Sequence, residues 1–85
     1  MNKHNEFTII CNKLILKMTL AKVESHKTIL STLLQKFYNN EVPADLWLVL
    51  NNDQAIDKLL AACSDNPTWA NINSKLLAMK GQTHD

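Results

Sequence analysis

Residues 42–50 read VPADLWLVL, and the five positions from Leu46 to Leu50 are all large and apolar. A short segment that is apolar on every side has no face left for water, so other parts of the chain or a partner must surround it. Pro43 fits the first turn of a helix, and the polar run that starts at Asn51 ends the pattern. The stretch therefore predicts a central helical turn or two, with the flanking amphipathic segments packed around it.

The chain has 85 residues, 46% of them hydrophobic, with one Gly and two Pro, which is typical of a single packed and mostly helical domain. Its formal net charge is +1, and its nine basic residues are lysines dispersed along the sequence. These features argue against a nucleic-acid partner, because such proteins concentrate basic side chains on one surface. No stretch approaches the roughly 20 apolar residues that span a membrane, and the N-terminus has no uninterrupted apolar core of a signal peptide. We expect a cytoplasmic protein without a membrane partner.

Residues 6–23 are ambiguous. As a helix, they carry one wide apolar stripe and a second stripe on nearly the opposite side, although a surface helix of a monomer needs only one. If the segment forms strands instead, apolar and polar residues alternate acceptably over residues 14–20, and residues 7–11 could pair with them. The missing Gly at the intervening turn and the helical remainder of the chain favour the helix. The first stripe contains Phe7, Ile10, Cys11, Leu14, Ile15, Met18 and Ala21, and the second contains Ile9, Leu16, Leu20 and Val23.

Three later segments follow helical spacing. We expect Ser25 to cap the first of them, which ends at the Asn pair 39–40, and Asp53 to cap the second. Pro67 is expected at the first position of the last helix, which runs to about Lys80. The expected inner faces are Ile29, Leu30, Leu33, Leu34, Phe37 and Tyr38, then Ala55, Ile56, Leu59, Leu60 and Cys63, and finally Trp69, Ile72, Leu76 and Met79, with Leu77 beside them.

Together these segments predict an all-α fold. The expected architecture is a small array of four to five short helices in antiparallel hairpins, similar to a tetratricopeptide repeat, because the connections between the helices are only two to five residues long. We expect one domain over residues 1–85, ordered over about 6–80, with frayed ends at 1–5 and 82–85.

Side chains that carry chemistry are few and scattered. His4, His26 and His84 have no metal-ligand spacing to the two cysteines, Cys11 and Cys63, which we expect to be buried thiols rather than a disulfide. A chain with a single Gly can hardly build a Gly-rich phosphate-binding loop. We therefore expect no enzymatic activity, no catalytic residues, no metal and no cofactor.

The C-terminal half resembles a known family in four short motifs. These are WLVL at 47–50, an Ala- and Leu-rich helix at 55–63, SDNP at 64–67 and MKGQ at 79–82. In this order they resemble the small tetratricopeptide-like chaperones of type III secretion systems that hold the needle subunit before export. The resemblance covers about residues 14–82. It implies a cytosolic, virulence-associated chaperone that cradles the amphipathic C-terminal helix of the needle subunit, usually beside a second small helical co-chaperone.

The second apolar stripe of residues 6–23 is more than a surface helix of a monomer needs to bury. With the two Trp and the Met residues, it suits a groove that holds a partner helix, although ordinary core in a well-wrapped domain explains it as well. A homodimer would also cover it. The alternative function is a small dimeric regulator or inhibitor of phage or plasmid type that acts by binding protein. The predicted partner-binding residues are Ile9, Leu16, Leu20 and Val23, with Leu46 and Trp47 as anchors.

Overall fold

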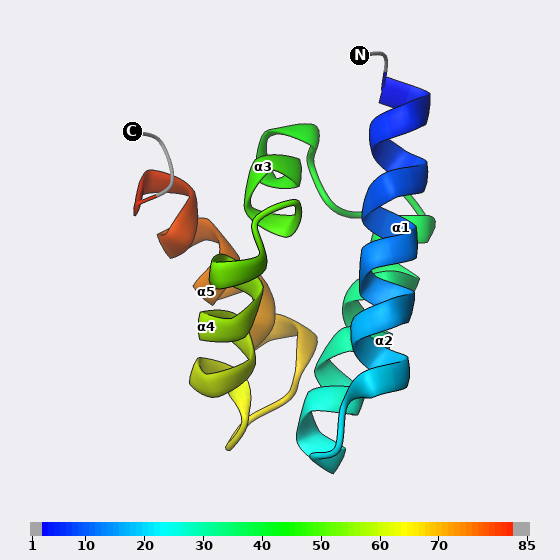
Figure 1. Ribbon diagram of the computed structural model, residues 1–85. Coiled ribbons are helices and arrows are strands. Elements are labelled where there is room, and N and C mark those ends of the chain that lie inside the picture. Colours follow the sequence, from blue (N-terminus) through cyan, green and yellow to red (C-terminus); the bar gives the residue numbers. More distant parts are fainter. Residues whose placement is uncertain (1–2, 83–85) are drawn as a thin grey trace.

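The computed structural model describes residues 3–82, and within this range the chain is all-α, with no strand. This confirms the predicted fold class and excludes the strand pair that residues 7–20 could have formed. The helices are connected by short turns (Figure 1). Their bounds are α1 Lys3–Leu20, α2 Glu24–Tyr38, the 3₁₀ turn η1 Ala44–Leu46, α3 Trp47–Leu50, α4 Asp53–Cys63 and α5 Trp69–Gln82.

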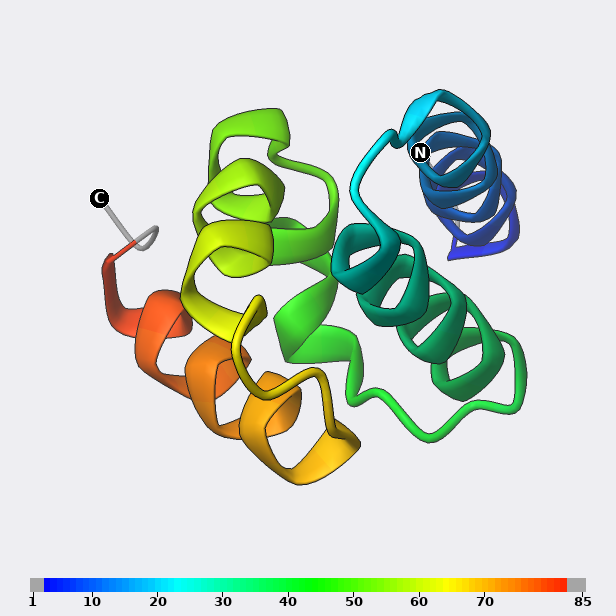
Figure 2. The ribbon, with the colours of Figure 1, turned by 90° about the horizontal axis from the view of Figure 1, so that it is seen from below.

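The helices form an array in which α1 lies at one edge. α1 and α2 make an antiparallel hairpin, and α2 also contacts α4 and α5 on its other side. Seen along the hairpin, α1 lies at the edge of the array, and α2 separates it from most of the other described helices (Figure 2). The ambiguous N-terminal segment is therefore a helix, α1, that α2 covers on one side.

An aromatic cluster around Phe37 joins the hairpin to the rest of the domain. The ring of Phe7 on α1 stacks on Phe37 of α2 with 4.8 Å between the ring centroids, and the Trp47 ring lies 5.1 Å from Phe37 on another side. The Trp47 indole Nε1 donates a hydrogen bond to the carbonyl oxygen of Val42 at 3.4 Å, which satisfies its polar atom. The buried core comprises Ile10, Cys11, Leu14, Ile29, Leu30, Leu33, Phe37, Val42, Leu46, Val49, Leu50, Ala55, Ile56, Leu59, Leu60, Cys63, Ile72 and Leu76.

Of the five large apolar residues at 46–50, three are buried as predicted, Trp47 is half-buried and Leu48 is exposed. Leu46, Val49 and Leu50 are at most 1% exposed, but the Leu48 side chain is 61% exposed. The prediction that this segment has no solvated face is therefore wrong. The segment forms one 3₁₀ turn and one α-helical turn, and a single turn points its side chains in all directions, so one of them reaches solvent.

The start of α2 differs from the prediction. Val23, not Ser25, occupies the N-cap position, and its side chain makes no capping hydrogen bond. Ser25 lies in the first turn instead, where its hydroxyl shares a hydrogen bond of 2.8 Å with the hydroxyl of Ser64. This contact connects α2 with the end of α4. The predicted end of α2 is confirmed, because Asn39 is its C-cap and Asn40 has the positive φ of 62° that follows many helices.

The ends of α1 and α5 also shift. Residues 3–5, expected to be frayed, belong to α1, whereas α1 ends at Leu20 instead of continuing to residue 23. α5 begins at Trp69, two residues after Pro67, and continues through Gly81 to Gln82. Thr68 precedes it, and the Thr68 hydroxyl accepts a hydrogen bond from the backbone N–H of Asn71 at 3.4 Å. The remaining residues expected to be frayed, 1–2 and 83–85, lie outside the described range.

Asn52, not Asp53, caps α4. Its side-chain oxygen accepts a hydrogen bond of 3.1 Å from the backbone N–H of Ala55, one of the donors that the first helical turn leaves unpaired. We therefore expect Asn52→Ala to lower the free energy of unfolding by about 1 kcal/mol, measured by urea denaturation. Asn52→Asp keeps the acceptor and should stay within a few tenths of a kcal/mol of the wild type. Equal stability of all three proteins would show that the cap contributes nothing.

An ion pair between Lys80 and Asp45 connects the end of α5 to η1. The hydrogen bond from Lys80 lowers the pKa of the Asp45 carboxyl below its ordinary value. A lowered folded-state pKa stabilises the fold above the unfolded pKa of about 3.9, and the contribution is lost as the pH falls through the folded value. We expect thermal melts of Asp45→Asn to show a weaker loss of stability below about pH 4 than melts of the wild type. Identical acid profiles would contradict this role of the pair.

Candidate interaction surfaces on the first helical hairpin

The far side of α1 carries three exposed apolar side chains, Ile9, Leu16 and Leu20, which we call the outer stripe. Their spacing of seven and four residues places them within roughly 40° of one another around the helix. They are between 38% and 66% exposed. The buried side of α1, formed by Ile10, Leu14 and their neighbours, faces the opposite way toward α2. Both stripes predicted from the sequence therefore exist, and the second is largely open to solvent. Its last residue, Leu20, also lines a hollow together with residues of α2 and α4.

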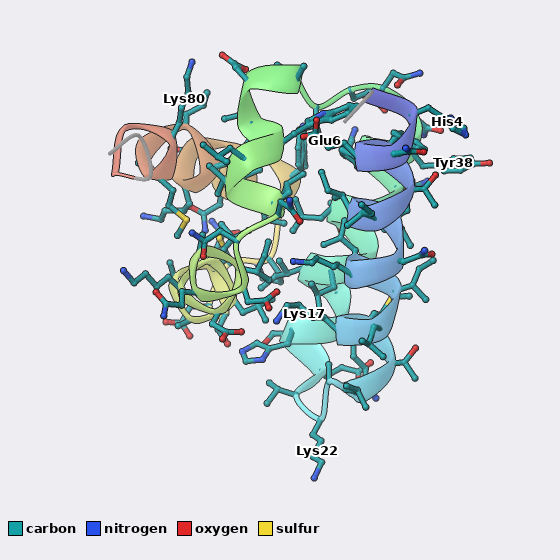
Figure 3. All side chains as sticks on the ribbon, turned by 45° about the horizontal axis from the view of Figure 1, so that its top comes forward. His4, Glu6, Lys17, Lys22, Tyr38 and Lys80 are labelled. Atoms are coloured by element: carbon teal, nitrogen blue, oxygen red, sulfur yellow. The ribbon has the colours of Figure 1, made fainter. Side chains whose placement is uncertain are left out.

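Two charged side chains in the middle of α1, Lys13 and Lys17, pair with the acidic residues at the start of α4. The Lys17 ammonium lies 3.5 Å from an Asp57 carboxylate oxygen and 3.9 Å from Asp53 (Figure 3). Lys13 lies 3.7 Å from Asp53 and donates a hydrogen bond of 3.1 Å to the carbonyl oxygen of Asn51. Exposed pairs of this kind contribute little stability each. Together they connect the middle of α1 with the start of α4.

A groove runs between α1 and α2, on a different side of α1 from the outer stripe. It has a volume of about 550 Å³ and is open to solvent. Ile15 and Tyr38, which stand at its two sides, are 45% and 68% exposed. A smaller hollow shares Ser31 with it and continues along α2 toward Lys27. We call the main hollow the outer groove, and its lining residues are Cys11, Ile15, Ser31, Leu34, Gln35 and Tyr38.

The outer groove can bind apolar side chains and make a few neutral hydrogen bonds. None of its six lining residues carries a carboxylate or an ammonium group, and Ser31, Gln35 and Tyr38 supply the polar atoms. Burial raises the pKa of the Cys11 thiol, so the thiol stays protonated at neutral pH and is a poor nucleophile. Cys63 on α4 is also a buried free thiol with a raised pKa. The groove therefore suits recognition better than covalent chemistry.

The structure separates the six residues predicted to bind a partner into two groups. The outer stripe residues are exposed together on α1, and Val23 is exposed in the short link that follows α1. Leu46 is completely buried, and the half-buried Trp47 ring packs against the stacked pair of Phe7 and Phe37. The two predicted anchors are thus part of the core in this conformation, and Leu46 has no surface to offer a partner.

The sequence pattern did not reveal the outer groove. Ile15 and Tyr38 both belong to stripes that we expected to be buried, but α1 packs along one side only, so its buried arc is narrower than the seven-residue stripe. Tyr38 is the last residue of α2, where the chain turns away from the core. The one signal in the sequence that could have indicated the outer groove was the unusually wide apolar stripe of α1.

A third hollow brings polar side chains together but offers a weaker site. Its volume is about 210 Å³, and Lys17, His26 and Asp57 lie around it with four apolar residues. Lys17 and Asp57 already pair with one another, which gives them a structural role. Within residues 3–82 no group of three or more His, Cys, Asp or Glu side chains is placed to hold a metal ion. None of the described helices is long and apolar enough to cross a membrane.

Comparisons with protein-family models, with characterised proteins and with solved structures gave no match for this chain. Its function must therefore be inferred from its own residues and geometry.

Proposed function

We propose that this protein is a non-enzymatic helical interaction module whose outer groove binds an amphipathic helix of a partner protein. The observation that carries the proposal is the groove itself, an open, uncharged and largely apolar hollow between two helices. Helices recognise one another by placing ridges of apolar side chains into such grooves. A hairpin with one open side offers this geometry without any rearrangement of its backbone.

The dimensions of the groove fit two to three turns of a bound helix. From Tyr38 to Ser31 the α2 wall rises through seven residues, about 10 Å, and the continuation to Lys27 brings it to about 16 Å. A bound helix could bury three or four large side chains there, each contributing roughly 1.5–3 kcal/mol. This gain can offset the cost of ordering the partner helix.

More specifically, we propose that the protein is a cytoplasmic type III secretion chaperone that captures a needle subunit. The resemblance of residues 47–82 to that family supports this proposal, and so does the physics of the groove. A subunit that polymerises exposes an apolar helix face, and a groove that buries this face blocks polymerisation by occupying the same surface. Co-expression with a needle-type subunit encoded beside this chain should yield a single defined complex. If both proteins purify separately, this finer identity is wrong, although another helix could still bind the groove.

The groove is tested with a synthetic peptide of about four helical turns that carries leucines at i, i+3, i+4 and i+7. Its matched control is a peptide of the same composition in which the leucines are dispersed around the helix. Fluorescence anisotropy of the labelled peptides should show saturable binding of the amphipathic peptide and at least a tenfold weaker affinity for the control, about 1.4 kcal/mol. Equal binding of both peptides, or binding of neither, would contradict the proposed function.

A second candidate is a small dimeric regulator of phage or plasmid type, and the uncovered outer stripe is the observation that favours it. Genes for an integrase or a repressor beside this chain would support the regulator, whereas a needle-type subunit gene would support the chaperone.

A further inference from the structure

We infer that the helix bound in the outer groove carries uncharged hydrogen-bonding side chains, such as Gln, Asn or Ser, along the one edge of its apolar face that meets α2. This inference rests on the proposed function and names the chemistry of the partner that the groove selects. It follows from a difference between the two walls of the groove, because α1 supplies only apolar side chains and α2 supplies mostly polar ones.

The α1 wall is apolar over its whole length. Cys11 and Ile15 line the outer groove, and Met18 lines the smaller hollow that continues it. Spacings of four and three residues place these side chains on one face of α1. The buried, protonated thiol of Cys11 behaves as a small apolar group. A partner side chain that packs on this wall therefore binds best when it is apolar.

The α2 wall presents a row of neutral polar groups. Ser31, Gln35 and Tyr38 are spaced by four and three residues, so they share one face of α2, and all three are exposed. The Tyr38 hydroxyl points outward (Figure 3). Within residues 3–82 the side chains of Ser31 and Gln35 have no hydrogen-bond partner. Leu34 is the apolar residue beside this row.

A bound helix removes water from the α2 wall. A polar group that loses water without gaining a new partner costs binding free energy. A helix that faced α2 with leucines alone would leave the Ser31 hydroxyl and the Gln35 amide unpaired. Gln, Asn or Ser at that edge can donate to both groups and accept from both groups. The two walls thus fix how the bound helix is rotated about its own axis.

Charge complementarity requires that this edge be neutral. None of the six lining residues of the outer groove is charged. Charged side chains line only the smaller hollow, where the Lys27 ammonium lies 3.9 Å from a Glu24 carboxylate oxygen and is already paired. A partner carboxylate or ammonium group beside Gln35 would lose water and find no opposite charge.

Two peptides of identical composition test the inference. Both carry the leucine ridge described above. The first has two glutamines on one edge of the ridge and alanines on the side away from it, and the second exchanges these residues. A helix can enter the groove in either direction, so one polar edge is enough to reach α2. Fluorescence anisotropy should show about tenfold tighter binding of the first peptide, which corresponds to about 1.4 kcal/mol.

A third peptide, with glutamates in place of the two edge glutamines, tests the neutrality of the edge. It should bind no more tightly than the second peptide, because its carboxylates find no opposite charge in the groove. If it binds as tightly as the first peptide, the edge need not be neutral and the inference is overturned.

A double variant of the protein, Ser31→Ala with Gln35→Ala, tests which residues read the edge. Its preference for the first peptide should fall from about tenfold to within about twofold. Both side chains are exposed, so the fold should be retained, which circular dichroism verifies. Gln54→Ala is the matched control, because Gln54 is an exposed glutamine of α4 that does not line the groove. This variant should keep the tenfold preference.

The outcomes separate the inference from the proposed function. Equal, saturable binding of the first two peptides to the wild type would overturn the inference and leave the proposed function in place. Binding of neither peptide would overturn both. A tenfold preference that persists in the Ser31 and Gln35 double variant would also overturn the inference, because the glutamines would then contact another surface.

Discussion

Phe37→Ala lowers the free energy of unfolding by about 3–5 kcal/mol, the largest stability effect that we expect from a single substitution in this chain. Phe37 is 1% exposed and contacts the rings of Phe7 and Trp47, so its removal leaves a cavity where α1, α2 and α3 meet. A domain of 85 residues has only a small margin of stability, so most of it would be lost. Urea denaturation followed by circular dichroism measures the change.

The matched control for this substitution is Leu48→Ala. Leu48 is a large apolar residue in the same region, but most of its side chain is in solvent, so its truncation should cost less than about 1 kcal/mol. If the two variants lose similar stability, the aromatic cluster is not the connection between the hairpin and the remaining helices that we describe.

Ile15→Asp weakens binding of the amphipathic peptide by roughly 30-fold or more. Ile15 lines the outer groove, and a carboxylate there removes an apolar contact and must lose water when the peptide binds. A loss of about 2 kcal/mol corresponds to this factor. Because Ile15 is 45% exposed, the fold should tolerate the change, which circular dichroism can verify. Fluorescence anisotropy with the labelled peptide gives the affinity.

Leu77→Asp is the matched control for the groove variant. It introduces the same charge at a leucine that is 53% exposed on α5, away from the hairpin. Peptide affinity should stay within about twofold of the wild type, which corresponds to a few tenths of a kcal/mol. A folded Ile15→Asp protein that binds as tightly as Leu77→Asp would show that the peptide does not occupy the outer groove.

Much of the fold could be predicted from the periodicity of apolar residues. All five residues of the expected inner face of α4 are buried, and the SDNP turn separates α4 from α5 as expected. Each of these segments has a single apolar stripe bounded by strong turn residues, so the pattern fits only one assignment of the helix and its buried face. The helix starts were less predictable, because Ser25, Asn52 and Asp53 are all good capping residues and the tertiary contacts decide which of them is used.

The candidate site could be predicted only in part. The second stripe of α1 was visible in the sequence, and three of its residues are exposed together. The burial of Leu46 and Trp47 was not visible, because an apolar run looks the same whether the chain itself or a partner covers it. The groove beside Ile15 depends on how α1 and α2 approach one another, and helix spacing within one segment carries no information about that.

NMR mapping of the bound amphipathic peptide on the ¹⁵N-labelled protein tests directly whether the peptide occupies the outer groove. We expect the backbone amide signals that shift on titration to cluster on Ser31, Leu34 and Gln35 of α2 and on the facing turn of α1 around Ile15. The control peptide with dispersed leucines should leave these signals in place. Shifts concentrated on α4 and α5, with the signals of the outer groove unchanged, would contradict the assignment of the groove as the binding surface.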